Sequence, residues 1–92
     1  MGSRSATELL QLPVQLHGIR LGQPVDFLFD EDGDRPLGFV VLCGDGIERF
    51  LVLGAADVGE DEIAVSSAFL LLEDVDFYRE RGRSFRELQT SA

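Results

Sequence analysis

Short apolar runs alternate with breaks rich in glycine and aspartate in the middle of the chain. The runs are residues 25–29, 37–43, 49–53 and 62–65. Short strands separated by turn residues at fairly regular intervals are typical of a small antiparallel β-barrel. The pattern therefore predicts an all-β fold.

Two further strands are predicted outside these four runs. Residues 14–17 alternate after Pro13, and residues 69–72 are apolar throughout. The Asp-Gly pair at residues 32–33 and the tight break at residues 44–46 are typical of hairpin turns. The sequence thus predicts a six-stranded antiparallel barrel.

Residues 39–43 and 50–53 carry no polar side chain, although a strand with one solvated face should alternate. These two strands are therefore expected to be covered on both faces. Asp74 can cap a helix that starts at Val75 and ends at Gly82, and residues 84–87 have the spacing of a capping box for a second helix.

The cover on the outer face is predicted to come from these C-terminal helical turns. Its expected members are Phe77, Tyr78, Phe85 and Leu88. Three parts of the chain follow: residues 1–12 as a flexible N-terminal segment, 13–72 as the barrel, and 73–92 as a helical extension.

The chain carries a formal net charge of −9, with 17 acidic residues against 8 arginines and no lysine. Direct contact with nucleic acid is disfavoured, because that contact requires a basic surface. Residues 1–75 hold 14 acids and 4 arginines, a net charge of −10, whereas residues 76–92 hold 3 acids and 4 arginines, a net charge of +1.

This uneven charge indicates either docking of the tail on its own barrel or contact with a partner. The candidate partner-contact residues are Arg79, Arg81, Arg83, Arg86, Phe77 and Tyr78.

Cys43 is the only cysteine, so no intramolecular disulfide can form, and the N-terminal residues lack the apolar segment of a signal peptide. No run approaches the roughly 18 apolar residues that cross a bilayer. A cytoplasmic protein without membrane insertion is predicted.

Residues 22–30 and 37–41, with 49–58 and 62–66 on the later strands, carry a resemblance to a known family. Residues 17–72 resemble a PRC-barrel domain, which is shared by the reaction centre H subunit, a ribosome maturation factor and many short prokaryotic proteins. The resemblance implies a docking or assembly module rather than an enzyme. One departure is Gly54-Ala55, where the family often has a proline followed by an aromatic residue.

The sequence predicts no catalytic, cofactor or metal site. Asp30, Asp32 and Asp34 alternate as in a calcium loop, but Arg35 replaces the glycine that such a loop requires. A solvated hairpin tip is the favoured reading, with a weak cation site as the alternative. His17 and Cys43 form the only thiol–imidazole combination, and both are expected on structural strands.

Asp26 lies among apolar neighbours, where an unpaired carboxylate would be costly. It is expected to accept hydrogen bonds from backbone amides or from Arg20 or Arg49, with a functional carboxylate as the alternative.

Three functions remain open. The leading hypothesis is a non-catalytic interaction module that forms a homodimer or joins a larger complex. The first alternative is an accessory of the ribosome or of RNA processing that binds a basic protein. The second is a small-ligand binder or enzyme using the barrel interior, which the phenylalanines of the strands are expected to fill.

Overall fold

In the computed structural model, which describes residues 6–33 and 35–85, eight strands form one sheet. Seven of them follow the order β5-β6-β1-β2-β3-β4-β7, and β8 pairs with β2 outside this path. The strands are β1 (Val14–Leu16), β2 (Ile19–Phe29), β3 (Pro36–Cys43), β4 (Glu48–Val52), β5 (Asp57–Val58), β6 (Ile63–Ala64), β7 (Leu71–Leu72) and β8 (Arg83–Ser84). The helices are α1 (Ala6–Leu9) and α2 (Val75–Arg81), with 3₁₀ turns η1 (Leu53–Ala55) and η2 (Ala68–Leu70).

The predicted all-β class is confirmed, but the prediction of a closed, six-stranded antiparallel barrel was wrong. The sheet is open, with β5 and β7 at its two ends, and β1 pairs in parallel with β6. Closing a barrel requires the two end strands to pair along their length. Here β5, β6, β7 and β8 have two residues each, so the late strands are too short to close the sheet.

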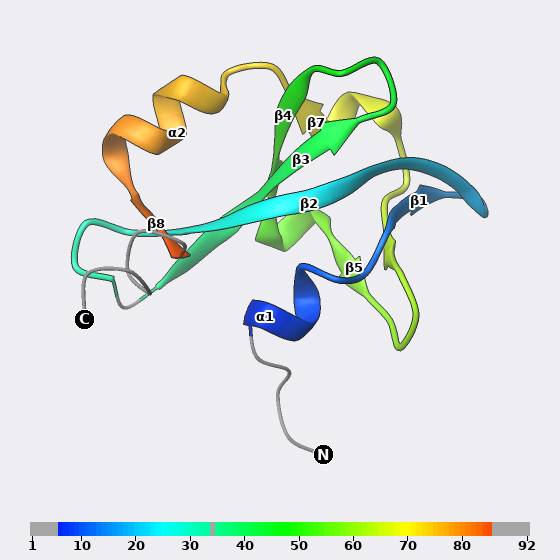
Figure 1. The fold of residues 1–92 in the computed structure, drawn as a ribbon, viewed down its shortest axis with the longest axis horizontal. Helices are drawn as coiled ribbons and strands as arrows, with labels where there is room; N and C mark the ends of the chain where they lie inside the picture. The colour runs from blue at the N-terminus through cyan, green and yellow to red at the C-terminus, as the bar shows by residue number, and fades with distance from the viewer. Residues whose placement is uncertain (1–5, 34, 86–92) are drawn as a thin grey trace.

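The longest strand, β2, organises the sheet (Figure 1). Residues at its start pair with β1, its last two residues pair with β8, and β3 runs antiparallel along most of its length. The sequence pattern predicted that this strand starts at Val25, because Gly22 and Pro24 are residues that usually interrupt strands. The strand continues through both residues, with a register shift between Pro24 and Asp26 that absorbs the proline.

The hairpin between β2 and β3 turns at residues 30–35, as predicted. The Asp30 amide donates to the Arg35 carbonyl oxygen at 2.8 Å, and the Arg35 amide donates to Asp30 Oδ1 at 3.3 Å. Gly33 supplies the positive φ of 75°. Asp34 lies outside the described residues.

Both faces of the central strands are covered over most of their length, as the apolar runs predicted, but Leu42 and Val52 are exposed. One face packs a cluster that includes Phe27, Phe39 and Leu51. The opposite face packs Leu28, Val40, Phe50 and Val75. Figure 1 shows α1 and α2 on opposite sides of the β2–β3 ribbon, where each adds to one cluster.

The helix α2 covers the second cluster mainly through one aromatic ring. Tyr78 stacks on Phe50 with ring centroids 4.0 Å apart and an interplanar angle of 14°. Phe77 was predicted as part of this cover but is 48% exposed, and Phe85 packs beside Phe29 on the other cluster. Leu88 lies outside the described residues.

The ends of α2 lie at the predicted residues, but their chemistry differs. Asp74 occupies the N-cap position without a side-chain cap hydrogen bond. Gly82 follows the helix with an extended backbone, and a Cβ there would lie 2.5 Å from the Phe29 carbonyl oxygen. Gly82 therefore allows the chain to approach β2 closely, rather than providing a left-handed cap.

Residues 6–12, within the segment predicted to be flexible, form α1 and a turn that lie against the first cluster. Leu9, Leu10 and Leu12 pack on that cluster. The Gln23 side chain donates to the Leu10 carbonyl oxygen at 2.8 Å and to that of Leu12 at 3.4 Å. A polar side chain of β2 thus fixes this turn to the sheet.

Asp26 joins β8 to β2. Its Oδ1 accepts from the Phe27 amide at 2.8 Å, and its Oδ2 accepts from the Ser84 hydroxyl. The backbone-amide expectation is confirmed, whereas the arginines bond elsewhere: Arg20 donates to Gln23, and Arg49 donates to Asp45. The buried carboxylate therefore holds the segment that follows α2.

Replacing Ser84 with alanine should lower the free energy of unfolding by about 1–3 kcal/mol, because Asp26 loses a donor while it stays buried. Ser66→Ala, at an exposed position, is the matched control and should change little. Urea unfolding of both variants measures the effect. Equal stability of Ser84→Ala and the unmodified chain would rule out this role for the serine.

Candidate functional site

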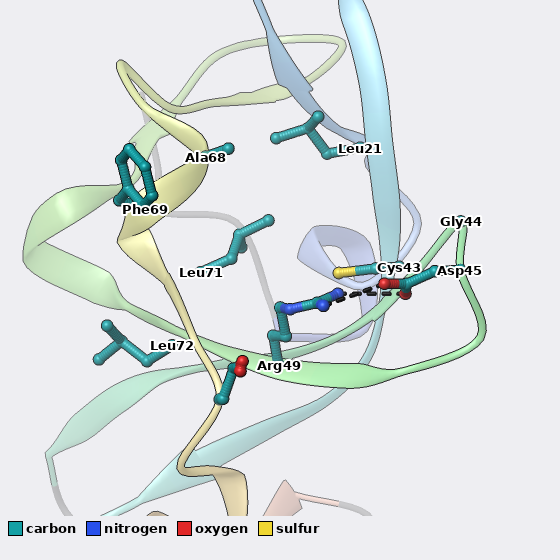
Figure 2. Close-up of a pocket in the computed structure, with 10 residues that line it drawn as sticks. Leu21, Cys43, Gly44, Asp45, Arg49, Ala68, Phe69, Leu71 and Leu72 are labelled. Carbon is teal, nitrogen blue, oxygen red and sulfur yellow. Dashed lines mark hydrogen bonds and ion pairs between the residues drawn. The ribbon is translucent and has the colours of Figure 1, made fainter.

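A groove of about 600 Å³ lies where the β3–β4 hairpin faces the η2–β7 segment. We call it the Phe69 groove. Its lining residues are Leu21, Cys43, Gly44, Asp45, Arg49, Ala68, Phe69, Leu71, Leu72 and Glu73. Figure 2 shows Leu21, Leu71 and Cys43 between Phe69 on one side and Gly44 with Asp45 on the other. The groove thus has an apolar floor between two walls.

The Phe69 side chain is 91% exposed, the largest exposure among the large apolar residues of the described chain. The turn η2 places it there. Ser67 precedes the turn in an extended conformation, and its hydroxyl oxygen accepts from the Phe69 amide at 3.1 Å. This local bond favours a 3₁₀ turn over the strand that the apolar run predicted, and the turn directs Phe69 away from the sheet.

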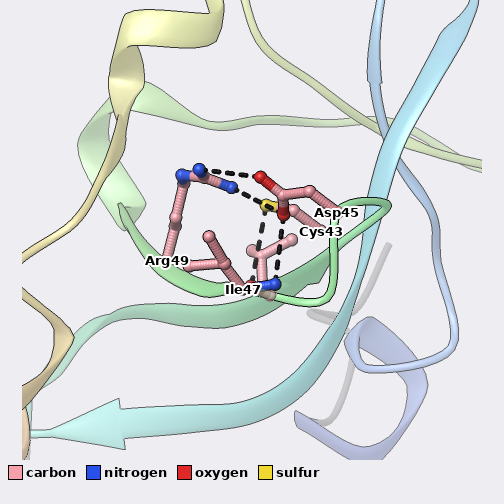
Figure 3. A network of polar contacts seen from close by, with 5 residues as sticks. Cys43, Asp45, Ile47 and Arg49 are labelled. Atoms are coloured by element: carbon pink, nitrogen blue, oxygen red, sulfur yellow. Dashed lines mark hydrogen bonds and ion pairs between the residues drawn. The ribbon is translucent and has the colours of Figure 1, made fainter.

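The opposite wall carries an ion pair (Figure 3). The two terminal nitrogens of Arg49 donate to the two carboxylate oxygens of Asp45 at 3.1 and 3.0 Å. The Ile47 amide also donates to Asp45 Oδ1 at 3.1 Å. This paired arrangement is the strong, geometrically specific form of the arginine–carboxylate contact.

The pair stays ionised at neutral pH. The hydrogen bond from Arg49, followed by that from the Ile47 amide, holds the pKa of Asp45 below its usual value. The pKa of Arg49 is raised, first by Asp45 and next by the Cys43 thiol beside it. Because the carboxyl pKa is lowered in the folded state, the contact is present above the ordinary pKa and is lost as pH falls through the lowered value.

The groove suits binding of an apolar side chain better than chemistry. The Cys43 thiol is buried and lies 3.8 Å from the Val41 carbonyl oxygen. Nowhere in residues 6–33 and 35–85 do three His, Cys, Asp or Glu side chains gather as metal ligands would. What the groove offers is an apolar floor, a projecting ring, an internally neutralised ion pair and the carboxylate of Glu73.

The thiol–imidazole combination is not assembled. Cys43 lines the Phe69 groove, whereas His17 occupies the turn after β1 with a positive φ of 50°. His17 borders a separate surface depression with Asp57 and Ser66. Asp26 is buried and does not line that depression.

The three described tail arginines each contact their own chain. Arg79 forms an ion pair of 2.9 Å with Glu48, and Arg83 Nε donates to the Glu31 carbonyl oxygen at 2.7 Å. The Arg81 guanidinium lies 3.7 Å from the centre of the Phe77 ring. Arg79 and Arg83 thus reach residues outside the tail, as self-docking would require, whereas Arg81 contacts a neighbour within α2, and Arg86 lies outside the described residues. Partner contact by this region stays a prediction.

The sequence interpretation did not identify the groove. Phe69 was assigned to a core strand because residues 69–72 are all apolar. One local signal was present. A serine two residues before Phe69 can accept a hydrogen bond from the Phe69 amide, and such a bond favours a turn. Asp45 was part of a predicted turn, and Arg49 was the first residue of the next predicted strand. Only the β3–β4 hairpin brings their side chains together.

No protein-family model matches the chain, and no curated protein matches its sequence. Among the helices described, none has the length and apolar character that a bilayer crossing needs.

Proposed function

We propose that this protein is a non-catalytic interaction module that self-associates through the Phe69 groove. The exposed phenyl ring beside an apolar groove carries the proposal. Aromatic side chains are enriched at the centres of protein interfaces, where burial of one ring contributes much of the binding energy. In a small acidic chain, most other surface positions are polar or charged.

The resemblance of residues 17–72 to PRC-barrel domains supports the same function, because that family consists of docking and assembly modules. We propose a distant relationship to it, in which the small β-domain is kept as an open sheet. A cytoplasmic location is part of the proposal, since a single unpaired cysteine suits a reducing compartment.

Replacing Phe69 with alanine should abolish self-association at micromolar concentration, and the melting temperature of the dilute, monomeric chain should not change, because the ring is exposed in the single chain. Val58→Ala is the matched control, since Val58 is an exposed apolar residue on β5 at the other end of the sheet. Light scattering during gel filtration measures the mass of each variant. A Phe69→Ala protein that remains dimeric would exclude the groove as the contact surface.

Salt separates this proposal from the alternative of a basic protein partner. Two copies of net charge −9 repel each other, so their association should strengthen as the screening length falls from about 30 Å at 0.01 M to about 8 Å at 0.15 M salt. Binding of a basic partner should weaken over the same range. Association that weakens with added salt would favour the basic partner.

A further inference from the structure

One wall of the Phe69 groove carries a projecting ring, and the floor beside it is a recess that such a ring can enter. Phe69 is 91% exposed, whereas Leu71 and Cys43 on the floor are almost fully buried within the single chain. The projection and the recess share one rim (Figure 2). A two-fold contact places the same patch of two copies face to face, so that patch must hold both a feature and its complement.

We propose that the occupant of the groove is Phe69 of a second copy of this chain, inserted reciprocally across a two-fold axis. This deepens the proposed function and rests on it. Each copy inserts its ring between the η2 wall and the β3–β4 hairpin of its partner. The structure meets the geometric condition for this contact, because the ring borders the recess of its own chain rather than lying on another face.

The position of the groove on the sheet favours a second copy. The strand β7 stands at one end of the strand order, and the described chain places no further strand on its outer edge. Edge strands related by a two-fold axis run antiparallel, so the two β7 edges can approach each other beside the inserted rings. The Asp45–Arg49 pair adds no net charge to the contact zone, whereas Glu73, which also lines the groove, brings one carboxylate from each copy, so added salt should strengthen the contact.

The area involved sets the expected affinity. Two phenylalanine rings and the groove walls they cover bury roughly 600–1,000 Å² in total. Specific protein interfaces begin near about 1,000–1,200 Å². The reciprocal dimer should therefore dissociate in the micromolar range.

The structure offers a way to fill the recess without disturbing the fold. Gly44 lines the groove, and a Cβ added there meets no atom within 4 Å. Gly44→Leu therefore adds a large side chain at the hairpin rim of the groove without a clash. Ala68→Leu blocks it from the η2 side and serves as a second variant. Gly54→Leu is the matched control, because Gly54 has the same open space but borders the His17 depression.

The test is complementation between two defective chains. Phe69→Ala lacks the ring but keeps the recess, and Gly44→Leu keeps the ring but has a filled recess. Each alone should show a dissociation constant raised more than about 100-fold, because two ring burials are lost per dimer. Mixed in equal amounts, they can form one intact ring-in-recess contact. Sedimentation velocity should show a mixed dimer at concentrations where each variant alone is monomeric.

The outcomes separate the inference from the proposed function. If the unmodified chain and Gly54→Leu dimerise, both defective variants are monomeric and their mixture dimerises, reciprocal insertion is supported. If the unmodified chain dimerises but the mixture of the two defective variants does not, reciprocal insertion is overturned while self-association stands. The same conclusion follows if Phe69→Ala still dimerises, or if both recess-filling variants still dimerise. If the unmodified chain is monomeric, the proposed self-association fails and the inference fails with it.

Discussion

A chain that ends after Leu72 should be largely unfolded or aggregated at 25 °C. The truncation removes α2 and β8, and with them the buried Val75 and the Tyr78 ring that stacks on Phe50. Each of these side chains contributes on the order of 1.5–3 kcal/mol of burial. Phe50 then lies open to solvent on a face that single chains seldom leave exposed. The loss is a large part of the roughly 5–15 kcal/mol that stabilises a domain.

Circular dichroism and light scattering of the truncated chain measure this effect. Two full-length variants locate its cause. Tyr78→Ala should cost about 3 kcal/mol or more, because it leaves a space over Phe50. Phe77→Ala should cost much less, since that ring is half exposed. A soluble truncated chain with an unchanged melting temperature would show that the tail is an appendage, and its arginines would then become the better candidates for a binding surface.

Gly38→Ala should lower the free energy of unfolding by about 3 kcal/mol or more. A Cβ at Gly38 would lie 2.1 Å from the Leu51 carbonyl oxygen and 2.9 Å from Cζ of Phe50. Both belong to β4, which pairs with β3 at this point, so the strands would have to separate. Overpacking in a well-packed interior costs about 1–3 kcal/mol, and a clash with a main-chain atom belongs at or above the upper end of that range.

The control for this prediction is the same substitution at an open site. Gly54→Ala meets no atom within 4 Å and should shift stability by no more than about 0.5 kcal/mol. Urea unfolding compares the two variants. Comparable stability of Gly38→Ala and Gly54→Ala would mean that β3 and β4 are not paired as described at this point.

The strand class and the central hairpins could be predicted because local residues determine them. The apolar run at residues 39–43 and the Asp-Gly turn before it are short-range signals, and both correspond to observed structure. The length of β2 could not be predicted from such signals. Gly22 lies within the strand, and a Cβ there would lie 2.6 Å from the Leu42 carbonyl oxygen. The position therefore requires glycine, but this close approach exists only after β2 and β3 pair.

The same distinction applies to the candidate site. The apolar residues 69–72 indicate burial, yet nothing in their order shows that the first of them faces solvent. The opposite wall depends on Asp45 and Arg49, which come together through the register of the β3–β4 hairpin. Closure of the sheet could not be predicted from the sequence either, because it depends on whether the two-residue strands β5 and β7 reach each other.

Sedimentation equilibrium of the unmodified chain tests the central claim, self-association, most directly. Across about 1 to 100 µM protein in 0.15 M salt, the average mass should rise from the 10.1 kDa of one chain toward twice that value. The rise should begin at lower protein concentration when more salt is added, because the copies carry like charge. An average mass that stays at 10.1 kDa across this protein range, both in about 0.15 M salt and with more salt added, would contradict self-association.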